Sequence, residues 1–138
     1  MRVFLDANVL ISAFSPKTVA GELLELITTR HSLVLGRFVL DETWRILVVK
    51  FGANPYLVQI FIDGLITYAA HVEPIPAPGV SRGLRDANDE AVLESAIASQ
   101  AGVLVTRDKD LLDEAARFAS EITILSPRGF MDQFLADE

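Results

Sequence analysis

Five short runs of β-favouring residues constrain the fold of this chain more than any other feature of its sequence. Strands that face solvent on one side alternate apolar and polar residues, whereas strands of a parallel sheet are buried on both faces and are apolar throughout. The runs are mostly apolar on consecutive positions, and we therefore predict a mainly parallel sheet. The expected strands cover residues 2–5, 32–35, 72–75, 103–105 and 122–125.

The longer segments between these runs have the spacing of helices. The signals are an apolar face, a capping residue before the first turn, and glycine or proline beyond the last. They predict a helix directly after Asp6 and further helices over residues 18–30, 38–51 and 55–70, from 86 or 88 to 101, from 108 or 109 to 118, and from 126 onward. Alternating strands and helices indicate an α/β protein, specifically a three-layer α/β/α sandwich with a mainly parallel central sheet.

Length and composition limit the number of domains and the kinds of chemistry. A chain of 138 residues with 51% hydrophobic residues fits one compact domain. The proline-rich residues 74–83 are too few to separate two domains, so we expect a surface loop there and a single domain over residues 1–138. The absence of cysteine excludes disulfide scaffolds, thiol nucleophiles and zinc–thiolate sites.

Membrane insertion and secretion are not expected. No apolar run reaches the roughly 18 residues that a membrane span needs, and the first residues do not resemble a signal peptide. We therefore expect a cytoplasmic protein. The formal net charge of −7 argues against a domain that covers nucleic acid with a basic surface, unless many acids converge on a metal ion.

Acidic residues follow the expected strands, where parallel α/β sheets bind ligands. Asp6 closes the first strand, and Asp108 and Asp110 come shortly after the fourth. Asp86 and Asp89 stand at the start of the helix that leads into that fourth strand. These acids are therefore expected to gather at one edge of the sheet. Glu42 lies one turn into a different helix.

Carboxylates brought this close together require a counter-charge. A pair at 4–6 Å costs roughly 3–4 kcal/mol at an effective dielectric constant near 20. A divalent cation removes this cost, and oxygen ligands without cysteine or clustered histidine favour Mg²⁺, with Mn²⁺ as a substitute. The alternative for each acid alone is a helix cap or a solvent-facing charge, and only their combination favours a metal site.

Four segments of the chain together match a known pattern. They are LDANVLIS at residues 5–12, LDE at residues 40–42, RDAND at residues 85–89 and LVTRDKDLL at residues 104–112. In this order, the segments resemble the PIN-domain ribonucleases, especially the small bacterial toxins of VapC type and their close relatives. The resemblance extends from residue 2 to about residue 112.

In that family, four acidic positions bind one or two Mg²⁺ or Mn²⁺ ions, and metal-activated water cleaves RNA phosphodiesters. The resemblance implies that this chain is a metal-dependent endoribonuclease whose four acids are Asp6, Glu42, Asp89 and Asp108. It implies Asp110 as an auxiliary acid that also binds metal, and as further auxiliary residues it implies Asn8, Asp86 and Thr106. It also implies an RNA substrate, a cognate antitoxin protein whose segment fills the acidic groove, and a homodimer.

When the acids of this cluster are left out of the sum, the net charge of the chain no longer argues against RNA binding. With the six acids at positions 6, 42, 86, 89, 108 and 110 left out, the formal net charge of −7 becomes −1. Basic residues that flank the expected site are candidates for contacts with phosphate, although each is as readily an ordinary surface charge. They are Arg37, Arg45, Arg82, Arg85, Arg107 and Lys109.

Two other functions compete with a nuclease. One is a PIN-like module that binds RNA or protein without cutting, but such a module has no reason to keep mutually repelling carboxylates. The other is a phosphohydrolase or receiver-like domain that uses an aspartyl phosphate. That chemistry needs a lysine after a late strand, whereas the last expected strand is followed by Ser126 and Pro127.

Overall fold

The computed structural model describes residues 1–15, 17–77 and 81–134. These residues form a five-stranded sheet in the order β3-β2-β1-β4-β5, in which all neighbouring strands are parallel. The predicted parallel sheet is thus confirmed. Its strands are β1 (Arg2–Leu5), β2 (Ser32–Gly36), β3 (His71–Glu73), β4 (Val103–Val105) and β5 (Thr123–Leu125).

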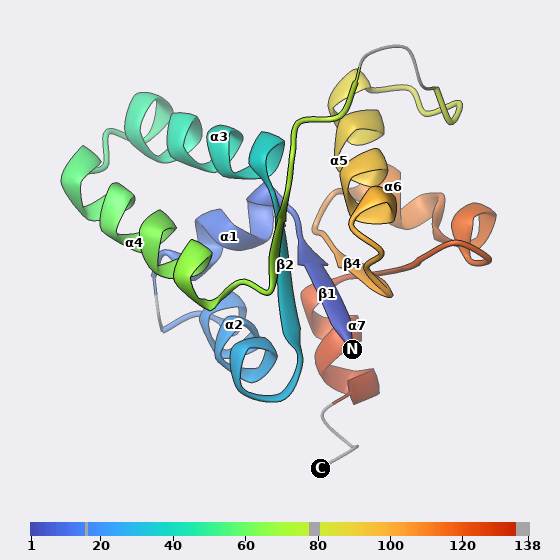
Figure 1. Cartoon of the computed structure of the whole chain (residues 1–138), viewed down its shortest axis with the longest axis horizontal. Helices are drawn as coiled ribbons and strands as arrows, with labels where there is room; N and C mark the ends of the chain where they lie inside the picture. The colour runs from blue at the N-terminus through green and yellow to red at the C-terminus, as the bar shows by residue number, and fades with distance from the viewer. Residues whose placement is uncertain (16, 78–80, 135–138) are drawn as a thin grey trace.

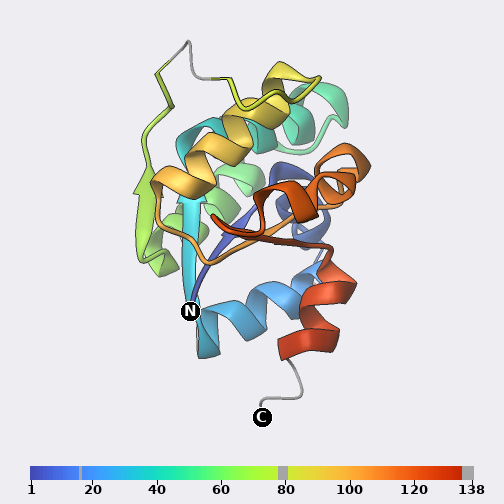
Figure 2. The ribbon, with the colours of Figure 1, turned by 90° about the vertical axis from the view of Figure 1, so that its right-hand side faces the viewer.

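Helices cover both faces of the sheet (Figure 1). One face carries α1 (Ala7–Ala13), α2 (Val19–Arg30), α3 (Arg37–Arg45) and α4 (Pro55–Tyr68). The other carries α5 (Ala87–Ala98) and α6 (Lys109–Asp113). The last helix, α7 (Pro127–Phe134), packs beside α2, as Figure 2 shows. The predicted three-layer α/β/α sandwich is therefore confirmed.

The core is centred on β1 and β4. Val3, Phe4 and Leu5 are each 0% exposed, and so is Leu104 in the neighbouring strand. Successive side chains of a strand point to opposite faces, and helices cover both faces here, so both sets are buried. This burial is the physical reason why these strands are apolar on consecutive positions.

None of the helices in the described part of the chain combines the length and apolar character needed to cross a membrane.

The register of the central strands brings their carboxyl ends to the same level. Leu5 of β1 pairs with Val105 of β4, and the next residue, Asp6, donates its backbone N–H to the carbonyl oxygen of Val105 at 3.0 Å. On the other side of β1, β2 ends at Gly36 and α3 begins at once. The side chains that follow these strands therefore share one edge of the sheet.

Two of the predicted helices change their hydrogen-bonding pattern along their length. The helix expected over residues 38–51 begins at Arg37 and continues beyond α3 as a π-helix, η1 (Ile46–Lys50). The helix expected over residues 108–118 divides into α6 and a 3₁₀ helix, η2 (Ala115–Phe118). Apolar residues spaced three or four apart fit all three helix types, so the sequence pattern could not distinguish them.

The edge strand β3 and the loop after it differ slightly from expectation. The strand was expected over residues 72–75 but covers His71–Glu73. Pro74 follows directly, and because proline has no N–H it cannot continue the ladder of hydrogen bonds. The expected loop over residues 74–83 has no helix or strand at residues 74–77 and 81–83, and residues 78–80 lie outside the described part of the chain.

Gly36, the last residue of β2, leaves room for the ring of Phe4, and its replacement is expected to destabilise the protein. A Cβ at this position would lie 2.8 Å from Cζ of the fully buried Phe4. Gly36→Ala should lower the free energy of unfolding by roughly 1–3 kcal/mol, the usual cost of overpacking. Chemical denaturation measures this change.

Gly64→Ala provides a matched control. Gly64 lies within α4, and a Cβ there would meet nothing within 4 Å. Alanine is a better helix former than glycine, so this variant should gain about 0.5–1 kcal/mol. Equal effects of the two substitutions would contradict the assigned contact between Gly36 and Phe4.

Candidate functional site

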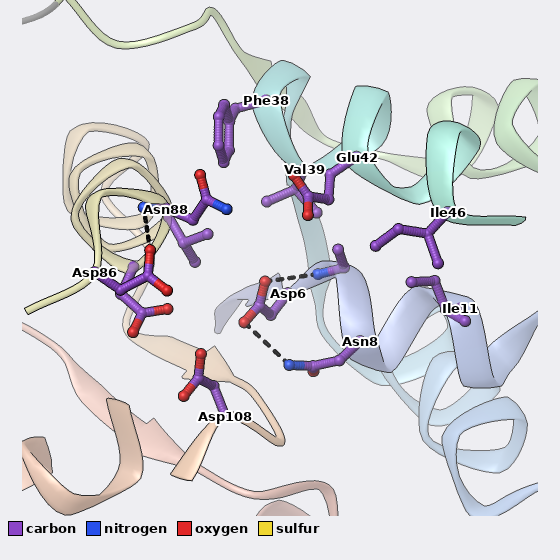
Figure 3. Close-up of a pocket in the computed structure, with 13 residues that line it drawn as sticks. Asp6, Asn8, Ile11, Phe38, Val39, Glu42, Ile46, Asp86, Asn88 and Asp108 are labelled. Carbon is purple, nitrogen blue, oxygen red and sulfur yellow. Dashed lines mark hydrogen bonds between the residues drawn. The ribbon is translucent and has the colours of Figure 1, made fainter. Parts of the chain in front are cut away.

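A cleft of about 230 Å³ lies at the carboxyl edge of the sheet (Figure 3). Segments that are distant in sequence form its walls: α1 and its capping residue, α3 with the start of η1, the first half of α5 with its capping residue, and the residue before α6. Of the site residues predicted from the sequence, those that line it are Asp6, Asn8, Glu42, Asp86, Asp89 and Asp108. Thr106 and Asp110 lie beside the cleft rather than on its wall.

Asp6 is held rigidly in the centre of this arrangement. It caps α1, where Oδ1 accepts the backbone N–H of Ala7 at 2.7 Å. Its Oδ2 accepts the hydroxyl of Thr106 at 2.7 Å. The side chain is buried, and this burial raises the pKa of Asp6, with smaller contributions in the same direction from the charges of Asp108 and Glu42. The hydrogen bonds from Thr106 and Ala7 oppose the rise.

Asn8 and Thr106 connect the segment after β1 to the segment after β4. The Asn8 side chain accepts the backbone N–H of Arg107 at 3.0 Å and donates weakly to Asp6 at 3.4 Å. The Thr106 hydroxyl, which donates to Asp6, accepts the backbone N–H of Asp108 at 3.0 Å. The two residues proposed as auxiliary thus fix the relative positions of Asp6 and Asp108.

Three carboxylates converge most closely at the start of α5 and α6. Oxygen atoms of Asp89, Asp108 and Asp110 all lie within 4.8 Å of one another. Asp108 also caps α6 by accepting the backbone N–H of Asp110 at 2.9 Å. One Asp108 oxygen thus has a partner within its own helix, and the carboxylate still belongs to the group of three.

The closeness of these groups changes the titration of Asp89. Burial raises its pKa from 3.8 to about 7, aided by a hydrogen bond with Asp108 and by the negative charges of Asp108, Asp86 and Asp6. A hydrogen bond between two carboxyl groups requires a proton on one of them. In the absence of a cation, the group therefore retains a proton at a pH where isolated carboxyl groups are ionised.

Glu42 and Asp86 lie farther out. Glu42 faces the cleft from α3 and is paired with Arg45 at 3.3 Å, and its charge contributes to the raised pKa of Asp6. Asp86 caps α5 by accepting the backbone N–H of Asn88 at 2.8 Å. The structure does not bring either residue into the group of three carboxylates, although both line the same cleft.

This donor set suits a hard divalent cation. All the converging atoms are carboxylate oxygens, the ligands that Mg²⁺ and Mn²⁺ prefer. Two of the acids, Asp6 and Asp89, have raised pKa values, and a cation would remove the repulsion that contributes to them. Asp89, Asp108 and Asp110 are the residues placed to hold such an ion, with Asp6 and Glu42 facing the same space.

The cleft also has an apolar wall that the sequence analysis did not assign to the site. Its members occur one helical turn from an acidic or amide residue of the cleft: Ile11 is three residues after Asn8, and Val92 is three after Asp89. Phe38 and Ile46 lie four residues on either side of Glu42. This spacing on a common helix face was the available signal, because residues three or four apart lie on the same side of a helix.

Most of the basic residues predicted near the site have acidic partners. Arg82 is bound to Glu94 and Glu121, and its side chain is only 20% exposed. Arg37 pairs with Asp41, Arg45 with Glu42, Arg85 with Asp110 and Lys109 with Asp113. Arg82 therefore does not reach toward phosphate. The Arg107 side chain is exposed and forms no ion pair with the residues that the structure describes.

Comparisons with known proteins agree with this architecture. A family model for the PIN domain matches residues 2–110. The fold is similar to that of VapBC2 from Rickettsia felis bound to a DNA fragment from their promoter, with 19% identity, a TM-score of 0.62, and coverage of 91% of this chain and 98% of that chain. It is also similar to a PilT N-terminus domain protein from the archaeon Sulfolobus solfataricus P2, with 15% identity, a TM-score of 0.58, and coverage of 96% and 92%. A search of curated proteins found no match.

The raised pKa of Asp89 predicts that the metal-free protein loses stability as the pH rises. Because folding raises this pKa, the stability that its protonation contributes is complete below about pH 3.8 and is lost as the pH rises through about 7. In EDTA, the melting temperature should therefore fall between about pH 5 and about pH 8. Asp89→Asn should flatten this fall, whereas the exposed control Asp63→Asn should keep it.

A bound cation replaces the proton, so Mn²⁺ should raise the melting temperature more at the higher pH. At 100 times its dissociation constant, the ion stabilises the fold by about 2.7 kcal/mol. Thermal melts with and without Mn²⁺ at both pH values test this. A Mn²⁺ effect that is equal at the two pH values, or equal in Asp89→Asn and the parent, would contradict the proposed linkage.

Proposed function

This chain belongs to the PIN-domain family, and from that premise we propose that it is a metal-dependent endoribonuclease that hydrolyses RNA phosphodiesters. The observation that carries the proposal is the convergence of Asp89, Asp108 and Asp110 beside a cleft that Asp6 and Glu42 also line. Neutral hydrogen-bonding residues would avoid the electrostatic cost of this arrangement. A bound cation would remove this cost and would also attract a phosphodiester, which carries a negative charge.

In this proposal, Mg²⁺ is the cofactor and Mn²⁺ its substitute. Asp89, Asp108 and Asp110 would hold the ion, and Asp6 at the centre of the cleft and Glu42 on α3 would complete its set of ligands. When bound, such a cation neutralises charge on a phosphate oxygen and lowers the pKa of water. The catalytic acids are Asp6, Glu42, Asp89 and Asp108, and the auxiliary residues are Asn8, Asp86 and Thr106.

The surrounding residues keep these acids in working geometry. Thr106 and Ala7 occupy one hydrogen-bonding direction of each Asp6 oxygen and thereby orient the carboxylate toward the cleft. Asn8 prevents the segment before Asp108 from separating from α1, because it binds the Arg107 backbone. The exposed Arg107 guanidinium follows immediately after Thr106, where it is available to an incoming phosphate. The apolar wall limits access of bulk water to one side of the site.

We further propose that the enzyme is the toxin of a toxin–antitoxin pair, acting in the cytoplasm as a homodimer of single-domain chains. The likeness of its fold to VapBC2 supports this proposal, as does the match of its motifs to VapC-type toxins. A cognate antitoxin would be the partner that restrains cleavage. The other candidate, a PIN-like module that binds RNA or protein without cutting, is an outcome of the following test.

Asp6→Asn and Asp89→Asn are expected to lower the rate of RNA cleavage by at least about 100-fold. Each substitution keeps the size of the side chain but removes a charge from the metal site, and loss of a ligand abolishes the chemistry that the ion supplies. Both variants should remain folded. The measurement is cleavage of mixed single-stranded RNA with Mn²⁺, with an EDTA control and with Asp63→Asn as a surface control that should retain activity.

Equal cleavage by the parent and both site variants would show a contaminating nuclease and would refute the assigned site. If RNA is bound but not cut, and Asp6→Asn binds it equally well or more tightly, the non-cleaving module is favoured. Expression in a bacterial host provides a second measurement, since growth arrest by the parent that Asp6→Asn abolishes supports a toxin. Normal growth with the active parent enzyme would contradict that role.

A further inference from the structure

The segment that leads into α5 is fixed by a carboxylate that lies next to the acidic site. Residues 81–86 form no helix or strand. The Glu90 side chain accepts the backbone N–H of Arg82 at 2.7 Å, the backbone N–H of Leu84 at 2.9 Å and the hydroxyl of Ser81 at 3.1 Å. Three donors of an otherwise irregular segment are thus tied to the first turn of the helix that carries Asp89.

The Arg82 side chain extends this connection to the residues between η2 and β5. It donates twice to Glu94 of α5, at 3.0 and 2.8 Å, and once to Glu121 at 2.9 Å. Glu121 lies between η2 and β5, in the part of the chain that follows Asp108 and Asp110. Arg82 therefore links α5 to the segment after α6.

Arg117 of η2 makes a second link between the same two segments. Its guanidinium donates to the carbonyl oxygens of Arg82 and Gly83. Gly83 has a φ of +78°, and a Cβ there would collide with the Arg117 guanidinium. The positive φ favours glycine at this position, whereas the Arg117 side chain is flexible enough to move away from a Cβ.

These contacts connect the two segments whose carboxylates repel each other. Asp89 lies on α5, whereas Asp108 and Asp110 lie at the start of α6, which leads into η2 and Arg117. In the described residues, Arg82 donates three of these hydrogen bonds, to Glu94 and Glu121, and Arg117 donates two, to the carbonyl oxygens of Arg82 and Gly83. The negative charges at the N-terminal ends of α5 and α6 repel each other. The hydrogen bonds of Arg82 and Arg117 oppose the separation of these two segments.

We propose that Arg82 and Arg117 form an arginine clamp, a pair of positioning residues that holds the acid-bearing segments together and thereby sets the affinity of the site for a divalent cation. The inference rests on the proposed function for the identity of the site. Neither residue touches the cleft, and Arg117 and its neighbour Glu121 lie beyond residues 2–110, the span that the family model matches. The clamp acts on the ion through the spacing of the carboxylates.

The test measures Mn²⁺ affinity by calorimetry in the full chain. Arg117→Met and Arg82→Met keep much of the side-chain volume but remove the donors. Each should weaken Mn²⁺ binding by about 10-fold or more, as is typical when a residue that orients metal ligands is lost. Arg117→Lys retains a charged donor and should recover much of the affinity. If Arg117→Met does not fold, the exposed Glu121→Gln should show a smaller weakening in the same direction.

Arg2→Met is the matched control. Arg2 donates to the backbone carbonyl of Ser99, at 3.2 and 2.6 Å, and so ties the opposite end of α5. Its loss should lower the melting temperature in EDTA, as the loss of Arg117 does, but should leave the Mn²⁺ affinity unchanged. A merely structural role for the clamp predicts the same Mn²⁺ affinity for both variants and for the parent.

The outcomes separate this inference from the ribonuclease proposal. Weaker Mn²⁺ binding by the clamp variants alone supports the clamp, even if the parent cuts no RNA. Unchanged Mn²⁺ affinity in Arg117→Met and Arg82→Met overturns the clamp. In that case, RNA cleavage by the parent would still support the ribonuclease proposal. A parent that binds no Mn²⁺ overturns both.

Discussion

Mutual repulsion among carboxylates at one edge of the sheet is the interaction that the neighbouring structure has to balance. The parallel arrangement creates it, because the carboxyl ends of β1 and β4 are in register and acidic residues follow both strands. Asp89 joins them from the start of α5, and its pKa rises to about 7 as a result of burial and of its acidic neighbours. A proton or a cation is therefore part of the stable state of this site.

Helix capping orients these acids and does not exclude a role in metal binding. Asp6, Asp86 and Asp108 cap α1, α5 and α6, and in each case Oδ1 accepts a backbone N–H. The second oxygen of Asp86 and of Asp108 is not used by the cap, and both residues line the cleft, whereas the second oxygen of Asp6 accepts hydrogen bonds from Thr106 and Asn8. Capping and metal binding are consequently compatible roles, and an N-terminal helix position also favours the negative charge.

The fold could be predicted from the sequence because its signals are local. The consecutive apolar positions of β1 and β4 indicated burial on both faces, and the alternation of strands and helices indicated the layers. The π-helix at Ile46–Lys50 and the break between α6 and η2 could not be predicted, since apolar spacing is the same for neighbouring helix types. The early end of β3 was foreseeable from Pro74, which cannot donate to a ladder.

The sequence by itself determined which residue types stand after which strands, and therefore that Asp6, Asp89 and Asp108 approach the same edge. Tertiary structure decided how closely each approaches. It placed Asp110 within 4.8 Å of Asp89 and Asp108, kept Glu42 on the opposite wall, and turned Arg82 away from the site toward Glu94 and Glu121. These choices depend on contacts between segments far apart in the chain, 39 residues for Arg82 with Glu121 and 100 residues for Asp6 with Thr106. Local spacing carries no information about them, because the distance between two such side chains is set by the packing of the helices and strands between them.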